Sequence, residues 1–405
     1  PPIFFHADDG IRDSATSRGL GDVYKRQLRC DPGRGLQLNR TIAVVGAGVV
    51  GAGVAWHLAR QGHRLTLIDP GLEAPLERTS GDGNHLTGTR ASLGVLMGNV
   101  FRRSSGRGWR LRQRSMALWP SWVCALQRQE PELILETPLL QLADGDETLG
   151  RMRKLADTRS ACGLSLLERH QLQAVWPGVT HGGLLSERDG RINPLMLLKA
   201  LRKALADLPV TGVAAAGVTI DRAEPGQGGG WRLGWHDGSC LHQDTGVICA
   251  ALNSPALLEP LGHPRPMQPV LGQALRLEIT SGPTDWMRWP AVMVHRGYNL
   301  IPDGHGHVLL GATVEPGERS EQEPLQLMRH LEDSAPEWLR NAKVLEHWSG
   351  LRARPVERPA PLLERLEPGL LLATGHYRNG VLLTPATAEW VEQHLEDSVS
   401  MITRF

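Results

Sequence analysis

Cysteines and long apolar runs are scarce in this sequence, and each scarcity excludes a class of protein. Tyrosines are scarce as well. The 405 residues contain five cysteines and three tyrosines. Five is an odd number and no two cysteines stand in a CxxC spacing, so we expect neither a disulfide framework nor a zinc site. No apolar run is long enough to span a bilayer. We therefore expect a cytoplasmic protein without a bound metal.

Lysine is also rare, and the overall charge is close to zero. The chain has 44 lysines and arginines against 43 aspartates and glutamates, which gives a net charge of +1. A protein built mainly to hold nucleic acid or an anionic membrane would carry a larger positive charge. The lysines are Lys25, Lys154, Lys199, Lys203 and Lys343.

One stretch departs from this balance. The segment FRRSSGRGWRLRQR, residues 101–114, carries six arginines and no acid: Arg102, Arg103, Arg107, Arg110, Arg112 and Arg114. Such a run can bind a phosphate backbone or an anionic substrate. It can equally be a solvated helix face, or pair with acids elsewhere in the fold. The sequence leaves these alternatives open.

The N-terminal stretch has no recognisable structure. Residues 1–36 lack the apolar core of a signal peptide and show neither helical nor strand periodicity. We interpret them as a non-native or disordered segment and leave them out of the fold.

A nucleotide-binding pattern begins at Thr41, with TIAVVGAGVVGAGVAWHLARQGHRLTLIDP. An apolar strand, residues 42–45, runs into Gly46-x-Gly48-x-x-Gly51, where Val49 and Val50 are further candidate contacts. A helix follows, with Val50, Val54 and Leu58 on one face. In this pattern the glycines allow a tight turn, close approach of a pyrophosphate and close packing of helix on strand. The positive end of the helix then receives the phosphate.

The next strand completes the pattern. Residues 65–68 are apolar and end at Asp69, 18 residues after Gly51. An acid at this place accepts hydrogen bonds from ribose hydroxyls. Strand, glycines, helix, second strand and acid together predict a dinucleotide site, although they do not separate NAD from FAD.

The segment that follows, residues 77–98, is rich in glycine, serine and threonine. Its backbone N–H groups and small side chains could cradle a flat isoalloxazine ring, and the candidate residues are Thr89, Arg90, Ala91, Gly94 and Val95. A surface loop is the alternative.

The middle of the chain alternates between helical and strand patterns. Residues 189–205 predict a turn and an amphipathic helix, and residues 298–318 predict a hairpin with its turn at 303–307. His305 and His307 lie in that turn without a third ligand nearby in sequence, so we expect no metal there.

The C-terminal segment LLLATGHYRNGVLLTPATA, residues 370–388, predicts a strand, a loop between two glycines and a helix. Thr384 and Pro385 have the residue types of an N-cap and a first helical residue. A helix that starts there would offer free N–H groups and its positive end to a ligand.

These segments resemble the glycine oxidase/D-amino-acid oxidase family of FAD-dependent amine oxidases. The likeness runs from about Thr41 to about His394 and is greatest to the glycine oxidase branch of thiamine biosynthesis. The pieces that carry it are the glycine fingerprint, PVLGQ, YNLIPDGHGHVLLGATVEPGE, WSGLRARP and LLLATGHYRNGVLLTPATA.

The resemblance implies an α/β fold in which a Rossmann-type FAD domain is interleaved with an antiparallel-sheet α+β substrate domain. The expected FAD domain comprises residues 37–100, 185–262 and 345–400. The expected substrate domain comprises residues 101–184 and 263–344.

The resemblance also implies a cofactor and site residues. FAD contacts would come from the fingerprint and the candidate loop, and from Val218, Ala251, His376, Arg378, Asn379, Gly380, Val381 and Leu382. The substrate carboxylate would lie on Arg352 of WSGLRARP, assisted by Tyr298, with Arg378 facing the substrate. A core position for Tyr298 and a capping role for Arg378 on the helix end remain open alternatives.

The implied activity is oxidative deamination of a small amino acid or secondary amine by hydride transfer to flavin N5, with oxygen as acceptor and peroxide as product. The chain departs from the family in ARPVERPAPLLERLEPG, which follows the GLR motif, in Leu252 where glycine is usual, and in the arginine-rich run. Two alternatives therefore stay open: trimming of a carboxymethylaminomethyl-type group on a tRNA wobble uridine, and a non-catalytic flavoprotein module. The sequence does not decide whether the protein forms a homo-oligomer.

Overall fold

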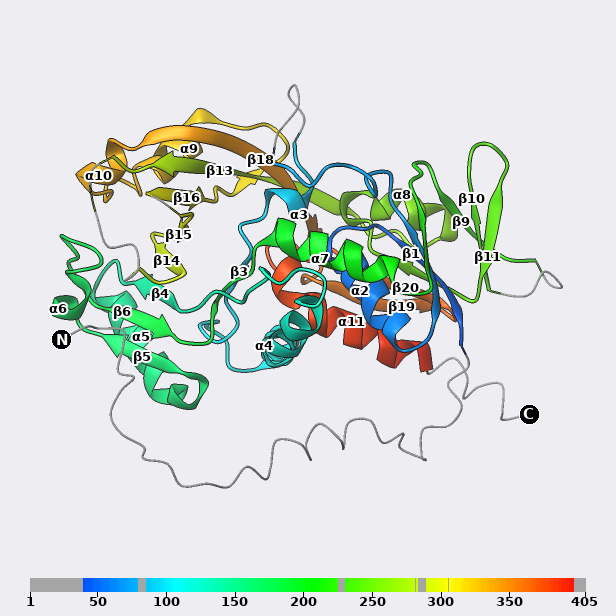
Figure 1. Ribbon diagram of the computed structural model, residues 1–405, viewed down its shortest axis with the longest axis horizontal. Helices are drawn as coiled ribbons and strands as arrows, with labels where there is room; N and C mark the ends of the chain where they lie inside the picture. The colour runs from blue at the N-terminus through cyan, green and yellow to red at the C-terminus, as the bar shows by residue number, and fades with distance from the viewer. Residues whose placement is uncertain are drawn as a thin grey trace.

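The computed structural model describes residues 39–78, 85–224, 230–280, 282, 289–304 and 306–396, and two large sheets dominate it (Figure 1). Residues 1–36 lie outside the described residues. The first sheet has six strands in the order β19-β20-β12-β1-β2-β8. Their bounds are β19 (Leu362–Glu367), β20 (Leu370–Thr374), β12 (Thr245–Ile248), β1 (Thr41–Val45), β2 (Arg64–Ile68) and β8 (Val210–Val213).

Five of these strands run parallel, and only β19 is antiparallel to its neighbour β20. Their near-continuous apolar sequences fit this arrangement, because the strands of a parallel sheet are covered on both faces. Strands β12, β1 and β2 therefore end at one edge of the sheet. The glycine turn after Val45 lies at this edge, where open α/β sheets bind their ligands.

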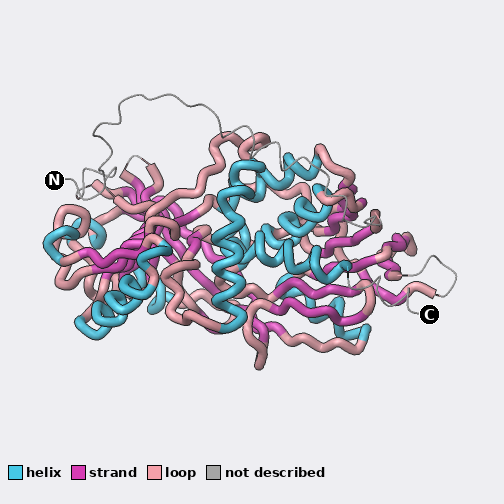
Figure 2. The backbone as a smooth tube through the Cα atoms, turned by 90° about the horizontal axis from the view of Figure 1, so that it is seen from below, coloured by secondary structure: helices cyan, strands magenta, loops and turns pink. Residues whose placement is uncertain are grey.

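Four helices cover one face of the six-stranded sheet, and Figure 2 shows the long helices gathered near the middle of the molecule. They are α2 (Val49–Arg60), α4 (Gly106–Leu126), α7 (Pro194–Ala206) and α11 (Gly380–Glu396). Helix α2 packs against α11 so closely that a Cβ at Gly53 would lie 2.3 Å from Thr384 Cγ2. The shared apolar core includes Leu58, Trp119 and Val391, all of them fully buried.

The second large sheet has nine strands in the order β17-β13-β16-β15-β14-β4-β6-β5, with β18 paired to β13. The bounds are β4 (Leu139–Leu142), β5 (Leu164–Leu167), β6 (Gly183–Ser186), β13 (Met267–Glu278), β14 (Val292–His295), β15 (Tyr298–Pro302), β16 (His307–Gly311), β17 (Glu315–Pro316) and β18 (Lys343–Pro355). Alternate residues of each strand serve two different cores. One core contains Trp176, Met328 and Trp338, and the other contains Leu86, Leu93 and Trp348.

Smaller elements complete the fold. Strands β9 (Thr219–Arg222), β10 (Trp231–Gly234) and β11 (Cys240–Gln243) form a separate sheet, and β3 (Val95–Leu96) pairs with β7 (Gly190–Arg191). The remaining helices are α3 (Gly88–Ala91), α5 (Asp146–Thr158), α6 (Arg169–Leu172), α8 (Ser254–Leu258), α9 (Gln322–Arg329) and α10 (Glu337–Arg340). None of the helices in the described part of the chain could span a bilayer.

The predicted fold class is confirmed, because a Rossmann-type sheet is interleaved with a mainly antiparallel one. Sheet membership and packing nevertheless place two elements differently from the expected domain boundaries. Strand β18 runs through residue 345 and belongs to the nine-stranded sheet, since it pairs with β13 along almost its whole length. Helix α4 packs on α11, although residues 101–184 were expected in the substrate domain.

The predicted hairpin forms, with Asp303 N donating to His307 O over 2.9 Å. The helix-start prediction at Thr384 and Pro385 is wrong. Helix α11 begins at Gly380, and Leu383 N donates to Asn379 O, one turn before the predicted start. Thr384 does not cap the helix, because its hydroxyl donates to Gly380 O inside the first turn.

Helix α4 binds Leu382 O, the carbonyl next to the one that loses its donor at Pro385. Proline has no N–H, and its ring opens the hydrogen-bond ladder near the carbonyls of the preceding turn. Leu382 O instead accepts hydrogen bonds from Ser115 Oγ and Trp119 Nε1, at 2.5 and 3.0 Å. Both donors are fully buried.

We expect Ser115→Ala to lower the free energy of unfolding by about 1 kcal/mol, and Ser115→Ala with Trp119→Phe to lower it by about 2–4 kcal/mol. The double variant costs more because it leaves the buried Leu382 carbonyl without either donor. Urea unfolding followed by tryptophan fluorescence measures the change. Ser121→Ala, an exposed position on the same helix, is the control and should change stability by less than about 0.5 kcal/mol. Equal effects of Ser115→Ala and Ser121→Ala would contradict this account.

Candidate functional site

The glycine turn that follows β1 has no room for side chains. Gly46 has φ +105°, and a Cβ there would lie 2.5 Å from the Cys249 carbonyl oxygen. A Cβ at Gly51 would lie 1.8 Å from the Gly46 carbonyl oxygen. The turn can therefore form only with glycine at these two places, which agrees with the roles predicted for them.

The N-terminus of α2 is open to an anion. Its first turn contains no acidic residue, and Val49 N donates to the Thr89 hydroxyl over 3.0 Å. Asp69 lies beside it, where one carboxylate oxygen accepts from Ala47 N and the other from Gly71 N, both at 2.7 Å. Each of these oxygens retains a lone pair for a ribose hydroxyl. The turn, the helix end and the acid thus fit the pyrophosphate and ribose of a dinucleotide.

A second helix begins next to the first. A Cβ at Gly380, the first residue of α11, would lie 3.9 Å from Val50 Cγ2. The positive ends of α2 and α11 therefore adjoin at the carboxyl edge of the six-stranded sheet. Two such ends favour negative charge on a ligand between them.

The short helix α3 joins the glycine turn to the nine-stranded sheet. Thr89 contacts α2, while a Cβ at Gly350 of β18 would lie 2.2 Å from the Ala91 Cβ. Leu86 N donates to Ser349 O over 2.9 Å, which ties the start of this segment to β18. Arg90 turns away, because its guanidinium donates to the Glu77 carbonyl oxygen.

Arg352 lies on β18 two residues after Gly350, and by strand alternation its side chain belongs to the same face, the one that α3 covers. Its Nη1 donates to the carbonyl oxygens of Leu271 and Thr313, at 3.0 and 3.1 Å. Burial, and next to it the charge of Arg378, lower the pKa of Arg352 to about 10. The group is still a cation at neutral pH, held by backbone carbonyls rather than by a carboxylate.

Glu315 is an acid that the sequence did not predict for this site, and its charge acts on Arg352. Glu315 is buried and accepts hydrogen bonds from Gln273 Nε2, from the Thr313 hydroxyl and from Glu321 N. Its charge favours the cationic form of Arg352 and raises the pKa of that guanidinium. Burial of an acid within a hairpin cannot be read from local periodicity, so the sequence offered no signal for it.

The structure does not bring Tyr298 and Arg352 together. Tyr298 packs with Trp338 in the core on the other face of the nine-stranded sheet, where burial and the charge of Glu332 raise its pKa. Its neighbour Asn299 alternates to the Arg352 face and donates to Gly311 O over 3.0 Å. The core position that we had left open for Tyr298 is thus the one it occupies.

Tyr377 lies nearer to Arg352. Its N–H donates to Ala353 O over 3.2 Å, which joins the loop after β20 to β18. Its backbone has φ +55°, a conformation that is uncommon for residues other than glycine. The next residue, Arg378, is exposed, and its charge acts on Arg352.

The other predicted residues of this loop have supporting positions. His376 is buried against α11 and contacts the Thr387 hydroxyl at 2.9 Å. Burial, and next to it the charge of Arg107, lower the pKa of His376 to about 3, so its imidazole is neutral. Val381 and Leu382 are buried within α11.

The four remaining candidates lie at backbone turns or in cores. Gly94 has φ +77° and no room for a Cβ, and Val95 pairs with Arg191. Val218 packs against the core that contains Trp231, and Ala251, with φ +50°, lies just after β12.

Three arginines of the 101–114 run bind protein groups. Arg107 donates to Pro361 O, Arg112 donates to Asn379 Oδ1 over 2.9 Å, and Arg114 forms an ion pair with Glu389. Arg112 also lies over the Phe101 ring, and burial lowers its pKa. Much of the run thus fastens α4 to α11.

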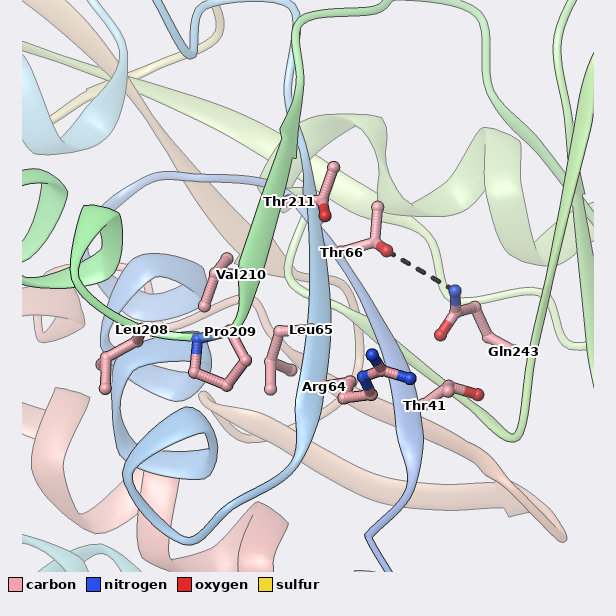
Figure 3. Close-up of a pocket in the computed structure, with 9 residues that line it drawn as sticks. All are labelled: Thr41, Arg64, Leu65, Thr66, Leu208, Pro209, Val210, Thr211 and Gln243. Atoms are coloured by element: carbon pink, nitrogen blue, oxygen red, sulfur yellow. Dashed lines mark hydrogen bonds between the residues drawn. The ribbon is translucent and has the colours of Figure 1, made fainter.

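Two surface grooves lie away from this site. One, of about 420 Å³, is formed at the start of β1, β2 and β8 by residues that include Arg64, Thr66 and Gln243 (Figure 3). It is at the opposite edge of the sheet from the glycine turn. The second, of about 470 Å³, lies between β8 and the three-stranded sheet.

No group of three histidine, cysteine or acidic side chains within the described ranges could hold an ion. His305 lies outside the described residues.

The glycine turn, the two adjoining helix ends and the half-buried Arg352 define a dinucleotide-dependent enzyme site of the Rossmann type. A model of the family described as DAO, FAD dependent oxidoreductase, matches residues 41–394. The chain therefore belongs to the DAO family of FAD-dependent oxidoreductases. Its cofactor is FAD.

Individual relatives agree with this placement. The chain is 28% identical to glycine oxidase from Pseudomonas putida over 366 residues, which is 87% of this chain and 93% of the relative. It is 31% identical over 302 residues to the tRNA 5-methylaminomethyl-2-thiouridine biosynthesis bifunctional protein MnmC from Burkholderia mallei, covering 72% of this chain but 42% of that relative. The crystal structure of glycine oxidase from Geobacillus kaustophilus superimposes with a TM-score of 0.73, at 22% identity, covering 88% of this chain and 95% of that one.

We expect Gly51→Ala to abolish retention of FAD and to lower the free energy of unfolding by about 1–3 kcal/mol, because its Cβ overlaps the Gly46 carbonyl. Flavin absorbance per protein and the thermal midpoint measure both effects. Gly150→Ala in α5 is the control, since its Cβ would meet open space. That change should keep the flavin and stabilise the helix by about 0.5–1 kcal/mol. Full flavin content in Gly51→Ala would refute the assignment of the turn.

Proposed function

We propose that the protein oxidatively deaminates a small amino acid or secondary amine of the glycine or sarcosine type. The observation that carries this proposal is Arg352, a half-buried cation bonded only to carbonyl oxygens and placed on the face of β18 that α3 covers. Its planar fork suits a carboxylate, which would take two parallel hydrogen bonds. The glycine oxidases among the relatives act on substrates of this class.

In this proposal the chain supplies orientation and electrostatics. A bound FAD would supply the hydride-accepting chemistry toward the substrate α-C–H. Arg352 holds the carboxylate, and the carbonyls of Leu271 and Thr313 keep its guanidinium in place. The adjoining ends of α2 and α11 stabilise negative charge that develops on the ring, and preorganised dipoles of this kind lower a reaction barrier. Water hydrolyses the resulting imine to a keto acid and ammonia or an amine.

The proposed electron acceptor is oxygen, with hydrogen peroxide as product. The described lysines lie away from the site: Lys154 is on α5, Lys199 and Lys203 bind Glu130 from α7, and Lys343 starts β18. We therefore propose no lysine-assisted step with oxygen. Peroxide release during turnover, measured with a coupled peroxidase, tests this point.

The tRNA alternative rests on the similarity to the bifunctional tRNA enzyme, of which this chain matches less than half. The arginine run gives it limited support, because Arg107, Arg112 and Arg114 bind protein groups. Salt-dependent binding of tRNA would favour this alternative, and turnover of free sarcosine would count against it.

We expect Arg352→Ala to raise the KM for sarcosine at least about 100-fold while flavin content stays unchanged, because charge-assisted hydrogen bonds to the carboxylate are lost. Anaerobic reduction of the flavin by sarcosine, followed at several concentrations, measures the change. Arg352→Lys should recover only part of the affinity, since an ammonium cannot bind both oxygens in one plane.

The matched control is Arg64→Ala, an exposed arginine of the groove in Figure 3. It should leave the KM at the wild-type value. If Arg352→Ala and Arg64→Ala have the same KM, Arg352 does not hold the carboxylate.

A further inference from the structure

Three arginines, Arg352, Arg354 and Arg378, lie near Tyr377. Arg352 and Arg354 alternate to the same face of β18, about 7 Å apart along the strand. Tyr377 is tied to the residue between them, since its N–H donates to Ala353 O over 3.2 Å. The Arg354 Cζ lies 5.7 Å from the centroid of the Tyr377 ring, and Arg378 follows directly in sequence.

No acid among the described residues bonds to this cluster, and Glu315 acts on Arg352 only through its charge. Arg354 and Arg378 form no ion pair or hydrogen bond with the described residues, and Arg352 bonds only to carbonyls. Other arginines of the same sheet are neutralised: Arg276, for example, binds both Asp303 and Glu346. The buried Glu315 already accepts bonds from Gln273, Thr313 and Glu321.

A single carboxylate on Arg352 leaves two of the three cations without a counter-ion. We propose that the substrate carries a second carboxylate, held by Arg354 and Arg378, and is therefore a small amine with two carboxylates. This inference rests on the proposed function, because it assumes that Arg352 takes the first carboxylate. The two residues stand on the same face of one strand, about 7 Å apart in backbone position, so their side chains can reach one small molecule.

Two N-substituted glycines test the inference directly, since sarcosine and iminodiacetate differ only in one added carboxylate. Anaerobic flavin reduction should give iminodiacetate a kcat/KM about 10–100-fold above that of sarcosine. Arg354→Gln and Arg378→Gln should each reduce this ratio several-fold, and Arg354→Lys should restore part of it. Arg64→Gln, in the distant groove, is the control and should leave the ratio unchanged. A ratio near one in the unmodified protein would overturn the inference.

Equilibrium binding separates this inference from the proposed function. Calorimetry on the FAD-loaded protein should show malonate binding at least about 10-fold more tightly than acetate, and Arg354→Gln should remove the difference. That result without flavin reduction by any amine would support the second carboxylate site and refute the proposed oxidation. Turnover of sarcosine with equal affinity for malonate and acetate would refute only the second site. Pyrophosphate or tRNA binding more tightly than malonate would also overturn it, because the cations would then serve a phosphate ligand.

Discussion

The site depends on the contact between two helix ends that are far apart in the sequence. Helices α2 and α11 can bring their N-termini together only because Gly53 leaves space for the Thr384 side chain and Gly380 lies against Val50. The remaining parts of the site are arranged around this contact. Helix α4 holds α11 from the other side and donates two hydrogen bonds to Leu382 O, close to the proline inside α11. The positive N-terminal ends of both helices are thereby held at one edge of the parallel sheet.

Around Arg352, the charge state of the site depends on burial and on the polar groups nearby. Arg352 is kept cationic in a low-dielectric setting by carbonyl oxygens and by the field of Glu315, which has no direct bond to it in the structure. A direct ion pair would neutralise the guanidinium and occupy its fork. Because Glu315 does not bond to Arg352, the guanidinium remains available for a ligand. Gln273 and Thr313 donate hydrogen bonds to Glu315 itself.

The sequence predicted what depends on local patterns and failed where distant segments decide. The fingerprint and the hairpin at 303–307 form as expected, because turn chemistry and apolar periodicity are local. Thr384 and Pro385 imitate a helix start, yet the helix begins at Gly380, and Ser115 and Trp119 bind Leu382 O close to the proline. The resemblance predicts that Tyr298 assists Arg352. Neighbouring residues of a strand point to opposite faces of a sheet, however, and Tyr298 packs on the face opposite Arg352.

Tyr377 shows how the two sheets meet at one point. Strand β20 belongs to the parallel sheet and β18 to the other, and the loop after β20 reaches β18 through the bond from Tyr377 N to Ala353 O. Its left-handed backbone costs about 1 kcal/mol or more, which tertiary contacts must offset. The same conformation sets Arg378 beside Arg352 and, one residue later, lets Asn379 receive Arg112 and begin α11. One strained residue thus holds Arg378 and the start of α11 in a fixed relation to β18.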